Sequence, residues 1–302
     1  MLNRKSIERT LAKYVAHKDP MVLERLTAFG PMILKAADLA KQMNAEPVEI
    51  SPEDLEATRA SKLTLLTKYP VAIPSENFVG VAQELAATLL TALALEGDIA
   101  DRCMAVDWSQ YATPELLELA GRTPGAYFDR VEALSEELDF FEFFVLPVLA
   151  YTLRVFLDAH ATEWSREIAN ERDDVAHHDR PVACPVCGTE AAIASVSETT
   201  ANGNRKKLHC TCCGASWLFE RIRCAHCGNE VVSDFQYLHD EEDDSHRLHV
   251  CKACGEATPT VFAPDELGFN ADIEQIVMTG LELFYEASKD EASAQPTAET
   301  QA

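Results

Sequence analysis

Residues 184–188 read Cys-Pro-Val-Cys-Gly, and the same Cys-x-x-Cys-Gly unit returns at residues 210–214, 224–228 and 251–255. The first and third units lie 40 residues apart, and the second and fourth lie 41 residues apart. This periodicity indicates a tandem duplication of one module that carries two units. Four units supply eight thiols, which are enough for two sites of four cysteines each.

Each unit has the chemistry of a metal-binding turn. Two cysteines three residues apart can reach one ion if the backbone between them turns tightly. The glycine that follows supplies a positive φ without steric cost, and Pro185 fixes φ at the start of the first turn. Two such turns brought together by a hairpin form the four-sulfur site of zinc ribbons and rubredoxin-like folds.

The spacing also predicts which turns share a metal ion. A gap of 22 or 23 residues separates the two cysteine pairs of each module, which is a suitable length for a hairpin. We therefore predict sequential pairing, with a cross-braced pairing (first with third, second with fourth) as the alternative. The predicted ligands are Cys184, Cys187, Cys210 and Cys213 for one site, and Cys224, Cys227, Cys251 and Cys254 for the other.

The predicted cofactors are two tetrathiolate metal ions, either iron or zinc, because four thiolates in tetrahedral geometry suit both metals. Iron would allow a redox role, whereas zinc would be structural. Disulfides are disfavoured because they need an oxidising compartment, and the N-terminus lacks the apolar stretch of a secretory signal. We therefore expect a cytoplasmic protein.

The two remaining cysteines and the nearby histidines are not expected to be metal ligands. Cys103 is expected to be a small buried hydrophobic residue, and Cys212 a spare thiol between two ligands. Eight cysteines already complete both sites, so the histidines are expected at the surface or beside the ligands. They are His209, His226, His239, His246 and His249.

Composition excludes other classes of protein. The chain has 302 residues, 47% of them hydrophobic, so it can bury a substantial core. A net charge of −24 argues against a nucleic-acid partner, since phosphate contacts need Lys and Arg. The basic cluster at residues 205–207 and the acidic run at 240–244 are both interpreted as solvated hairpin loops. No stretch is long and apolar enough to span a membrane.

The pattern changes near residue 175. Upstream, apolar periodicity and capping signals predict helices over residues 20–43, from Ser51, over 75–95, 113–121, 126–134 and 136–160. Gly30-Pro31 is expected to break the first of these, and the aromatic residues between 140 and 156 are expected in the core. Downstream, short strands are predicted at residues 192–197 and 216–223, and a helix at 270–288.

The predicted fold class is therefore α+β: an all-helical N-terminal domain, two tandem rubredoxin-like or zinc-ribbon modules, and a C-terminal helix. The predicted boundaries are 1–175 for the helical domain, 176–222 and 223–265 for the two metal modules, 266–288 for the closing helix, and 289–302 for a disordered tail.

The order of these motifs resembles one family. The relevant stretches are Cys184-Pro-Val-Cys-Gly, Leu208-His-Cys-Thr-Cys-Cys-Gly, Trp217 followed by Arg221-Ile-Arg-Cys-Ala-His-Cys-Gly, and Cys251-Lys-Ala-Cys-Gly. Together they are similar to the signature of the formate dehydrogenase accessory protein FdhE. Carried over by position, the eight cysteines would be the metal ligands. Trp217, Arg221 and Arg223 would belong to the strand between the modules.

The resemblance implies a cytoplasmic maturation factor and not an enzyme. Proteins of this family are needed to produce active formate dehydrogenase and are thought to bind its catalytic subunit. The expected partner is that subunit. We expect no nucleic-acid partner and no membrane-spanning segment, and the protein could also form a homodimer. The alternatives are a rubredoxin-type electron carrier, disfavoured by the large helical domain, and a zinc-ribbon transcription regulator, disfavoured by the negative charge.

Overall fold

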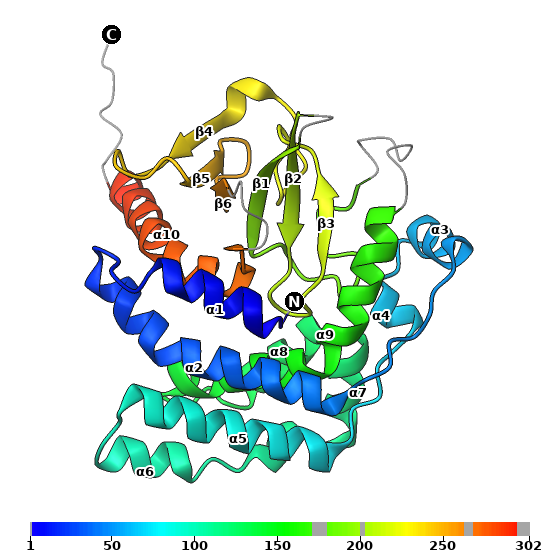
Figure 1. Cartoon of the computed structure of the whole chain (residues 1–302), viewed down its shortest axis with the longest axis vertical. Coiled ribbons are helices and arrows are strands. Elements are labelled where there is room, and N and C mark those ends of the chain that lie inside the picture. The colour runs from blue at the N-terminus through cyan, green and yellow to red at the C-terminus, as the bar shows by residue number, and fades with distance from the viewer. Residues whose placement is uncertain (1, 171–179, 200–202, 263–267, 295–302) are drawn as a thin grey trace.

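The computed structural model describes residues 2–170, 180–199, 203–262 and 268–294, and its architecture is α+β, as predicted. A layer of helices lies on one side, and a mixed six-stranded sheet and α10 (Ala271–Ala294) stand on it (Figure 1). The predicted domain boundaries stay a prediction, and the first of them falls among residues 171–179, outside the described part. Most of the tail, residues 295–302, also lies outside it.

The N-terminal region is helical, and local capping signals define several helix starts. Ser51 and Asp54 form a capping box at the start of one helix, and the Thr113 hydroxyl accepts the Leu116 N–H at the start of another. The helices are α1 (Arg4–Lys13), α2 (Pro20–Met43), α3 (Pro52–Ser61), α4 (Leu65–Lys68), α5 (Ser75–Leu93), α6 (Asp98–Met104), α7 (Pro114–Arg122), α8 (Pro124–Ala133) and α9 (Leu146–Asn170), with a 3₁₀ turn η1 (Trp108–Tyr111).

The predicted break at Gly30-Pro31 is wrong, because α2 runs through both residues. Pro31 removes one backbone hydrogen bond, but buried residues on either side of it, including Ala28 and Ile33, hold the helix in the core. Gly30 is buried where α2 faces α1, and a Cβ at this position would be in ordinary van der Waals contact with Leu11, 3.4 Å away.

The long aromatic helix is displaced from its predicted range of 136–160. A π-helical turn, η2 (Phe141–Val145), comes first, and α9 then continues ten residues past the predicted end. Pro147 lacks the N–H that an α-helical bond to Phe143 would use, which fits the wider turn before it. Phe140, Phe141, Phe144 and Phe156 are buried, as predicted, and so is Cys103, whereas Phe143 is exposed.

The sheet joins the two cysteine modules. Its strands follow the order β3-β2-β1-β6-β5-β4, and all pairs are antiparallel except β1–β6, in which Ala194 lies opposite Thr260. Each module thus contributes three strands, and the modules meet along the parallel pair. The strands are β1 (Ile193–Thr199), β2 (Gly203–His209), β3 (Ser216–Phe219), β4 (Phe235–Leu238), β5 (His246–Cys251) and β6 (Ala257–Phe262), with a 3₁₀ turn η4 (Val232–Asp234) before β4.

The interpretation of residues 205–207 as a solvated hairpin tip is wrong. These residues lie within β2, and Lys206 is only 3% exposed. Alternation along the strand turns this side chain toward the ring of Phe219 on β3, with Nζ 5.5 Å from the ring centroid. A basic run in sequence is therefore split between the two faces of the sheet.

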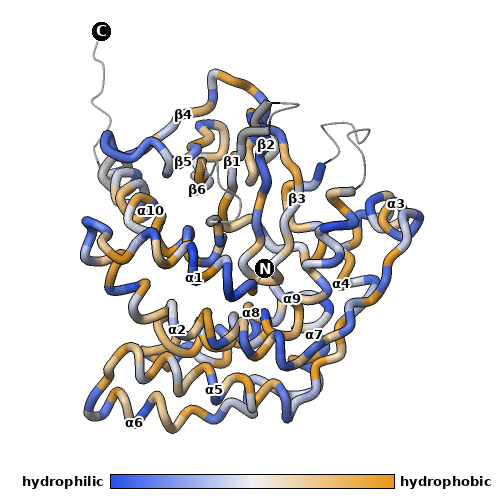
Figure 2. Tube along the Cα trace, viewed as in Figure 1, coloured by the Kyte–Doolittle hydropathy of each residue, from blue (hydrophilic) through white to orange (hydrophobic). Residues whose placement is uncertain are grey.

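Two hydrophobic clusters hold the layers together. The larger one runs from α1, α2, α5 and α9 into the first cysteine module and includes Cys184, Cys210 and Trp217. The smaller one lies between the sheet and α10, around Leu248 and Met278. Hydrophobic residues recur along α2, α5 and α9 between hydrophilic ones, as amphipathic packing requires (Figure 2). Among the described helices, none combines the length and apolar character needed to cross a bilayer.

A polar cluster fastens α1, β5 and α10 to one another. Glu274 of α10 is buried and accepts from the hydroxyl of Tyr14 at 2.5 Å, and His246 Nε2 lies 3.1 Å from the same carboxylate. The other nitrogen of His246 lies 2.7 Å from Asp243. Burial alone would lower the pKa of His246, but its contacts with Glu274 and Asp243 outweigh burial and raise that pKa above 6.5.

We predict that Glu274→Gln lowers the free energy of unfolding by about 1–3 kcal/mol at pH 6, because it removes the charge that faces protonated His246. Because the pKa of His246 is higher in the folded state than in the unfolded state, protonation of His246 stabilises the fold fully at pH values below the unfolded-state pKa. This stabilisation is lost as the pH rises through the folded-state pKa. The difference between wild type and variant should therefore shrink by pH 9 in urea unfolding. Glu286→Gln, on an exposed part of α10, is the control and should cost less than about 0.5 kcal/mol. A loss equal at both pH values would contradict the assignment.

Candidate metal centres

The four Cys-x-x-Cys-Gly units adopt one and the same turn. In each, the carbonyl of the first cysteine accepts the N–H of the glycine at 2.7–3.1 Å. The N–H of that cysteine donates to the carbonyl of the residue after the glycine at 2.8–2.9 Å. The four glycines have φ between 75° and 92°, the left-handed region that other residues enter only with strain. The local sequence therefore builds the turn, and the strands bring the turns together.

The turns meet in sequence order, first with second and third with fourth. In the first group, the Sγ atoms of Cys184 and Cys213 are 3.7 Å apart, and those of Cys187 and Cys210 are 3.5 Å apart. The hairpin of β1 and β2 closes this group, with Ile193 opposite His209 next to the second turn.

The second group repeats this arrangement. Cys224 and Cys254 have their Sγ atoms 3.7 Å apart, and Cys227 and Cys251 have theirs 3.8 Å apart. The pair β4–β5 closes this group, with Phe235 opposite Cys251. In both groups all four sulfurs lie within 4.8 Å of one another. The cross-braced alternative is therefore not the arrangement of this chain.

The sulfur positions fit a bound metal ion. Zinc–sulfur bonds of about 2.3 Å in a tetrahedron place the sulfurs about 3.8 Å apart. The observed separations of 3.5–3.8 Å are close to that value. All ten cysteines of the chain are free thiols. Two groups of four thiols could thus each hold one ion, and the same geometry suits zinc and iron.

The two groups differ in exposure. All four cysteines of the first group are buried, and they belong to the main hydrophobic core. In the second group Cys224 and Cys251 are buried, whereas Cys227 is exposed. A metal ion in the first group would be sealed from solvent, while one in the second would be accessible from one side.

A buried arginine lies beside the first group. The side chain of Arg154 is 1% exposed, and its Nη1 donates to the Thr211 carbonyl, inside the second turn, at 2.5 Å. Asp158 and Asp272 pair with it at 3.1 and 3.5 Å. A Cβ on Gly214 would lie 2.6 Å from Arg154 Nε, so the glycine also admits the guanidinium. Four thiolates around a divalent ion carry two excess negative charges, which this cation partly balances.

A buried lysine and an arginine lie beside the second group. Lys206 and Arg223 both approach the ring of Phe219, at 5.5 and 5.0 Å from its centroid. Burial lowers the pKa of Lys206 to about 8, while the thiol of Cys224 and the carboxyl of Glu220 act in the opposite direction. Of the two arginines in Arg221-x-Arg223, the second turns inward and bonds to the Arg180 carbonyl, whereas Arg221 is exposed.

Equivalent polar residues touch the sulfurs in both groups. Thr189 follows the first glycine, and its hydroxyl lies 3.1 Å from the Sγ atoms of both Cys187 and Cys210. Asn229 holds the same place 40 residues later, and its side-chain amide donates to Cys251 Sγ at 3.9 Å. Sequence reasoning missed these donors and Arg154, although the repeat aligns Thr189 with Asn229.

The five histidines lie outside both four-thiol groups. His209 bonds to Ser195 at 2.8 Å, and burial followed by the charges of Lys207 and Arg154 lowers its pKa to about 3. His249 packs edge-on against Tyr237, and burial lowers its pKa also to about 3. His226 contacts the Ala257 carbonyl and His239 the Asp240 carbonyl, while His246 belongs to the polar cluster on α10. Cys212 is half-buried and belongs to neither group.

The first group is docked onto the helices by backbone hydrogen bonds. The N–H groups of Leu65 and Leu66, at the start of α4, donate to the carbonyls of Pro185 and Val186 at 3.0 and 2.9 Å. The N–H of Ser216 donates to the Ser165 hydroxyl on α9. Trp217 is buried, and its indole donates to the Pro181 carbonyl. The first turn therefore cannot move without disturbing the helical layer.

Fold and site together define a helical protein that carries two four-cysteine sites on a small mixed sheet. We compared the chain with known proteins in sequence and in structure. No family model matches the chain. It is 25% identical to the Protein FdhE homolog of Aquifex aeolicus over 146 residues, 48% of this chain and 47% of that protein. It is 36% identical to the homolog of Pectobacterium carotovorum over 73 residues, 24% and 23% of the two chains.

The fold comparison covers more of the chain. The crystal structure of the FdhE protein from Pseudomonas aeruginosa matches 95% of this chain and 91% of its own, with a TM-score of 0.55 and 17% identity. In sequence, the chain matches less than half the length of these curated relatives. The predicted resemblance is confirmed: the chain is similar to FdhE proteins in sequence and in fold.

We predict that Cys184→Ser and Cys224→Ser each reduce the metal content from two ions to one. Cys184→Ser should also lower the free energy of unfolding by more than about 4 kcal/mol, since it leaves an incomplete site in the main core. The loss for Cys224→Ser should be smaller, because the second group lies outside that core. Elemental analysis and urea unfolding measure both quantities. Cys212→Ser is the control, and a lost ion in this variant would overturn the ligand assignment.

We also predict that Thr189→Val lowers metal affinity of the first site about 10–100-fold, because it removes the hydroxyl beside two sulfurs. Competition with a chelator of known affinity measures the change, and the second site provides the internal control. An unchanged first site would show that the hydroxyl only fills space.

Proposed function

We propose that the eight cysteines bind two metal ions and that the protein is an accessory factor for the maturation of formate dehydrogenase, acting in the cytoplasm by binding the catalytic subunit. The observation that carries the proposal is the pair of four-thiol groups in FdhE order on a fold similar to that of an FdhE protein. The similarity in sequence to curated FdhE homologs supports it.

The surface around the second metal site is the proposed contact with the catalytic subunit. Four exposed large hydrophobic side chains fall within residues 222–237, around Cys224 and Cys227. They are Ile222, Val231, Val232 and Tyr237. Exposed apolar side chains gathered near one site are typical of protein–protein contacts. In this proposal the first site holds the sheet on the helices, and the second shapes the contact surface.

An assembly factor that binds a partner needs no catalytic group of its own, and we propose a binding protein and not an enzyme. A second candidate function follows from the exposure of Cys227, because an accessible iron–thiolate centre could exchange electrons with a partner. Metal analysis and a visible spectrum of protein purified without oxygen separate the two. Two zinc ions and no colour would exclude the electron carrier.

We predict that Val232→Asp weakens capture of the formate dehydrogenase catalytic subunit at least tenfold in a pull-down, because it places a charge in an apolar contact. Val15→Asp is the matched control: Val15 is 79% exposed and Val232 is 67% exposed, but Val15 is not one of the apolar residues within 222–237 that form the proposed contact. The control should bind like wild type. In cells that lack the protein, Val15→Asp should restore formate-dependent dye reduction as well as wild type does, and Val232→Asp should restore it less.

Two results would contradict the proposal. Deletion of the gene could leave formate-dependent dye reduction intact, which would exclude a maturation role. Equal binding by both aspartate variants would instead leave the maturation role standing and place the contact away from the second metal site.

A further inference from the structure

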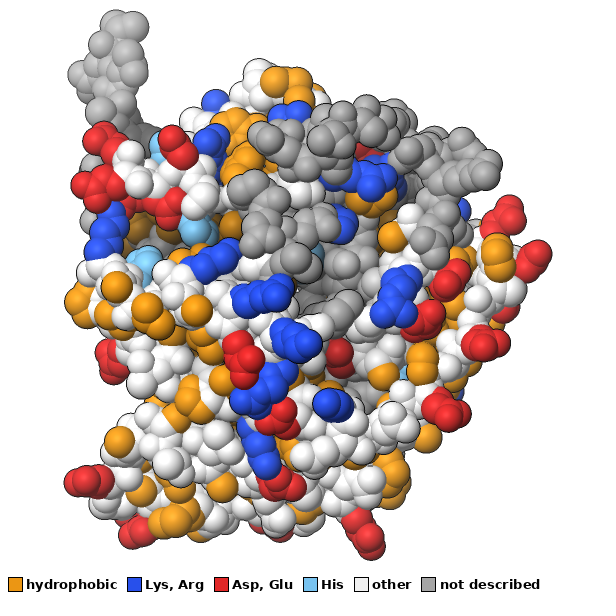
Figure 3. Space-filling model, in the orientation of Figure 1, with side chains coloured by type: hydrophobic (Ala, Val, Ile, Leu, Met, Phe, Trp, Pro, Cys, Tyr) orange, Lys and Arg blue, Asp and Glu red, His pale blue; other side chains and the backbone are white. Residues whose placement is uncertain are grey.

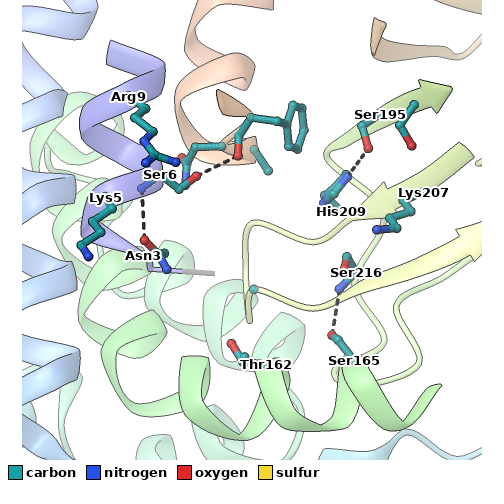
Figure 4. A pocket seen from close by; sticks show the side chains of 15 residues that line it. Asn3, Lys5, Ser6, Arg9, Thr162, Ser165, Ser195, Lys207, His209 and Ser216 are labelled. Atoms are coloured by element: carbon teal, nitrogen blue, oxygen red, sulfur yellow. Dashed lines mark hydrogen bonds between the residues drawn. The ribbon is translucent and has the colours of Figure 1, made fainter. Parts of the chain in front are cut away.

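A pocket of about 430 Å³ opens where α1, the start of α10, the sheet and α9 meet. Figure 4 shows Lys5, Ser6 and Arg9 of α1 on one side, Ser195, Lys207 and His209 of the sheet on the other, and Thr162 and Ser165 of α9 below. The mouth is held in place by hydrogen bonds from Ser6 and Thr10 to the Phe269 and Gly268 carbonyls, at 2.8 and 3.0 Å.

The pocket has positively charged side chains in its lining, whereas the chain as a whole is negatively charged. The protein has 50 acidic and 26 basic residues, yet the described residues that line this pocket include Lys5, Arg9 and Lys207 and no carboxylate. Lys and Arg side chains gather on this face of the molecule (Figure 3). Asp158 and Asp272 do not line the pocket, and both pair with buried Arg154. The pocket is therefore a local positive site on a negative protein.

The two cations on α1 are placed for a ligand. Lys5 and Arg9 are four residues apart, so they lie on the same face of the helix, where like charges repel by a few tenths of a kcal/mol. Neither forms an ion pair with a described residue, whereas Arg4 on the same helix pairs with Glu8 and Asp38. An anion between Lys5 and Arg9 would turn the repulsion into attraction.

Hydrogen-bond donors complete the pocket. The hydroxyl of Thr162 is shielded from solvent and has no hydrogen-bond partner in the described part of the chain. Leaving such a group unpaired costs about 1–3 kcal/mol, which a ligand oxygen would recover. Two helices, α1 and α10, also begin at the pocket, where Asn3 and Ala271 line it, and helix starts favour negative charge.

We propose that this pocket binds a small molecule that carries a phosphate group. Three cations together with a hydroxyl and two helix starts suit a dianionic, tetrahedral group better than a single carboxylate. The volume is at the lower end of the range for small-molecule sites, about 300–1,000 Å³, and is too small for a folded segment of a partner. The Phe269 and His209 rings, with centroids 4.8 Å apart, give the pocket an aromatic wall for an organic portion of the ligand.

This proposal does not depend on the maturation role, because it concerns a different part of the molecule. The test is calorimetric titration of the full-length, metal-loaded protein with inorganic phosphate and, separately, with a nucleoside monophosphate. Saturable binding of either supports the proposal. Tighter binding of the nucleoside monophosphate would identify an organic phosphate as the ligand, and equal binding would identify free phosphate.

Arg9→Gln should weaken phosphate binding at least tenfold, because it removes one of three cations at an exposed position that does not affect folding. Lys13→Gln is the matched control, since it makes the same change in charge on the exposed surface of the same helix outside the pocket. It should bind within twofold of wild type. Thr162→Val, nearly equal in size to threonine, should also weaken binding.

Three results would overturn the proposal. They are the absence of saturable binding by either phosphate, equal weakening by Arg9→Gln and Lys13→Gln, and binding of a short polyglutamate peptide where phosphate does not bind. The second result would show that phosphate binding depends only on the overall charge of the protein and not on this pocket. The third would indicate that the pocket binds an acidic segment of a protein partner.

Discussion

Four sulfur atoms gathered within 4.8 Å of one another, with the nearest pairs 3.5–3.8 Å apart, set the condition on which the rest of this structure depends. Two full charges about 4 Å apart repel by about 4 kcal/mol at an effective dielectric constant of about 20, so four thiolates cannot share a site without a cation. A bound metal ion would meet that need at the centre, and Arg154, Lys206 and Arg223 lie outside it as positive charges. Binding and folding are then linked, because the first group belongs to the main core.

The duplicated modules have diverged in what surrounds them. Their Cys-x-x-Cys-Gly turns have the same hydrogen bonds, and Thr189 and Asn229 hold equivalent positions beside the sulfurs. In the first module, however, two turn carbonyls accept hydrogen bonds from N–H groups of α4 and Trp217 is buried, whereas the second module leaves Cys227 at the surface. The first module thus packs its four-thiol group into the main core. The second module has its four-thiol group and the nearby apolar residues at the protein surface.

Sequence predicted what is local and missed what is long-range. The turns and the capped starts of α3 and α7 follow from residues a few positions apart, and the grouping of the thiols follows from the repeat spacing. The break expected at Gly30-Pro31 failed because contact with Leu11 and burial of the flanking residues decide that segment. Lys206 could not be recognised as buried without the register that sets Phe219 opposite it. The parallel pairing of β1 with β6 likewise has no local signal.

The first four-thiol group and the pocket lined by Lys5 and Arg9 share parts of the chain. Lys207 and His209 line the pocket from β2, directly before Cys210, and Gly214 lines it directly after Cys213. Ser165 lines it as well and holds β3 through the Ser216 N–H. The second turn of the site is thus also one wall of the pocket, while α1 and α10 form the opposite wall. Because the second turn belongs to the first four-thiol group, the position of this wall is linked to the first group and not to the more exposed second one.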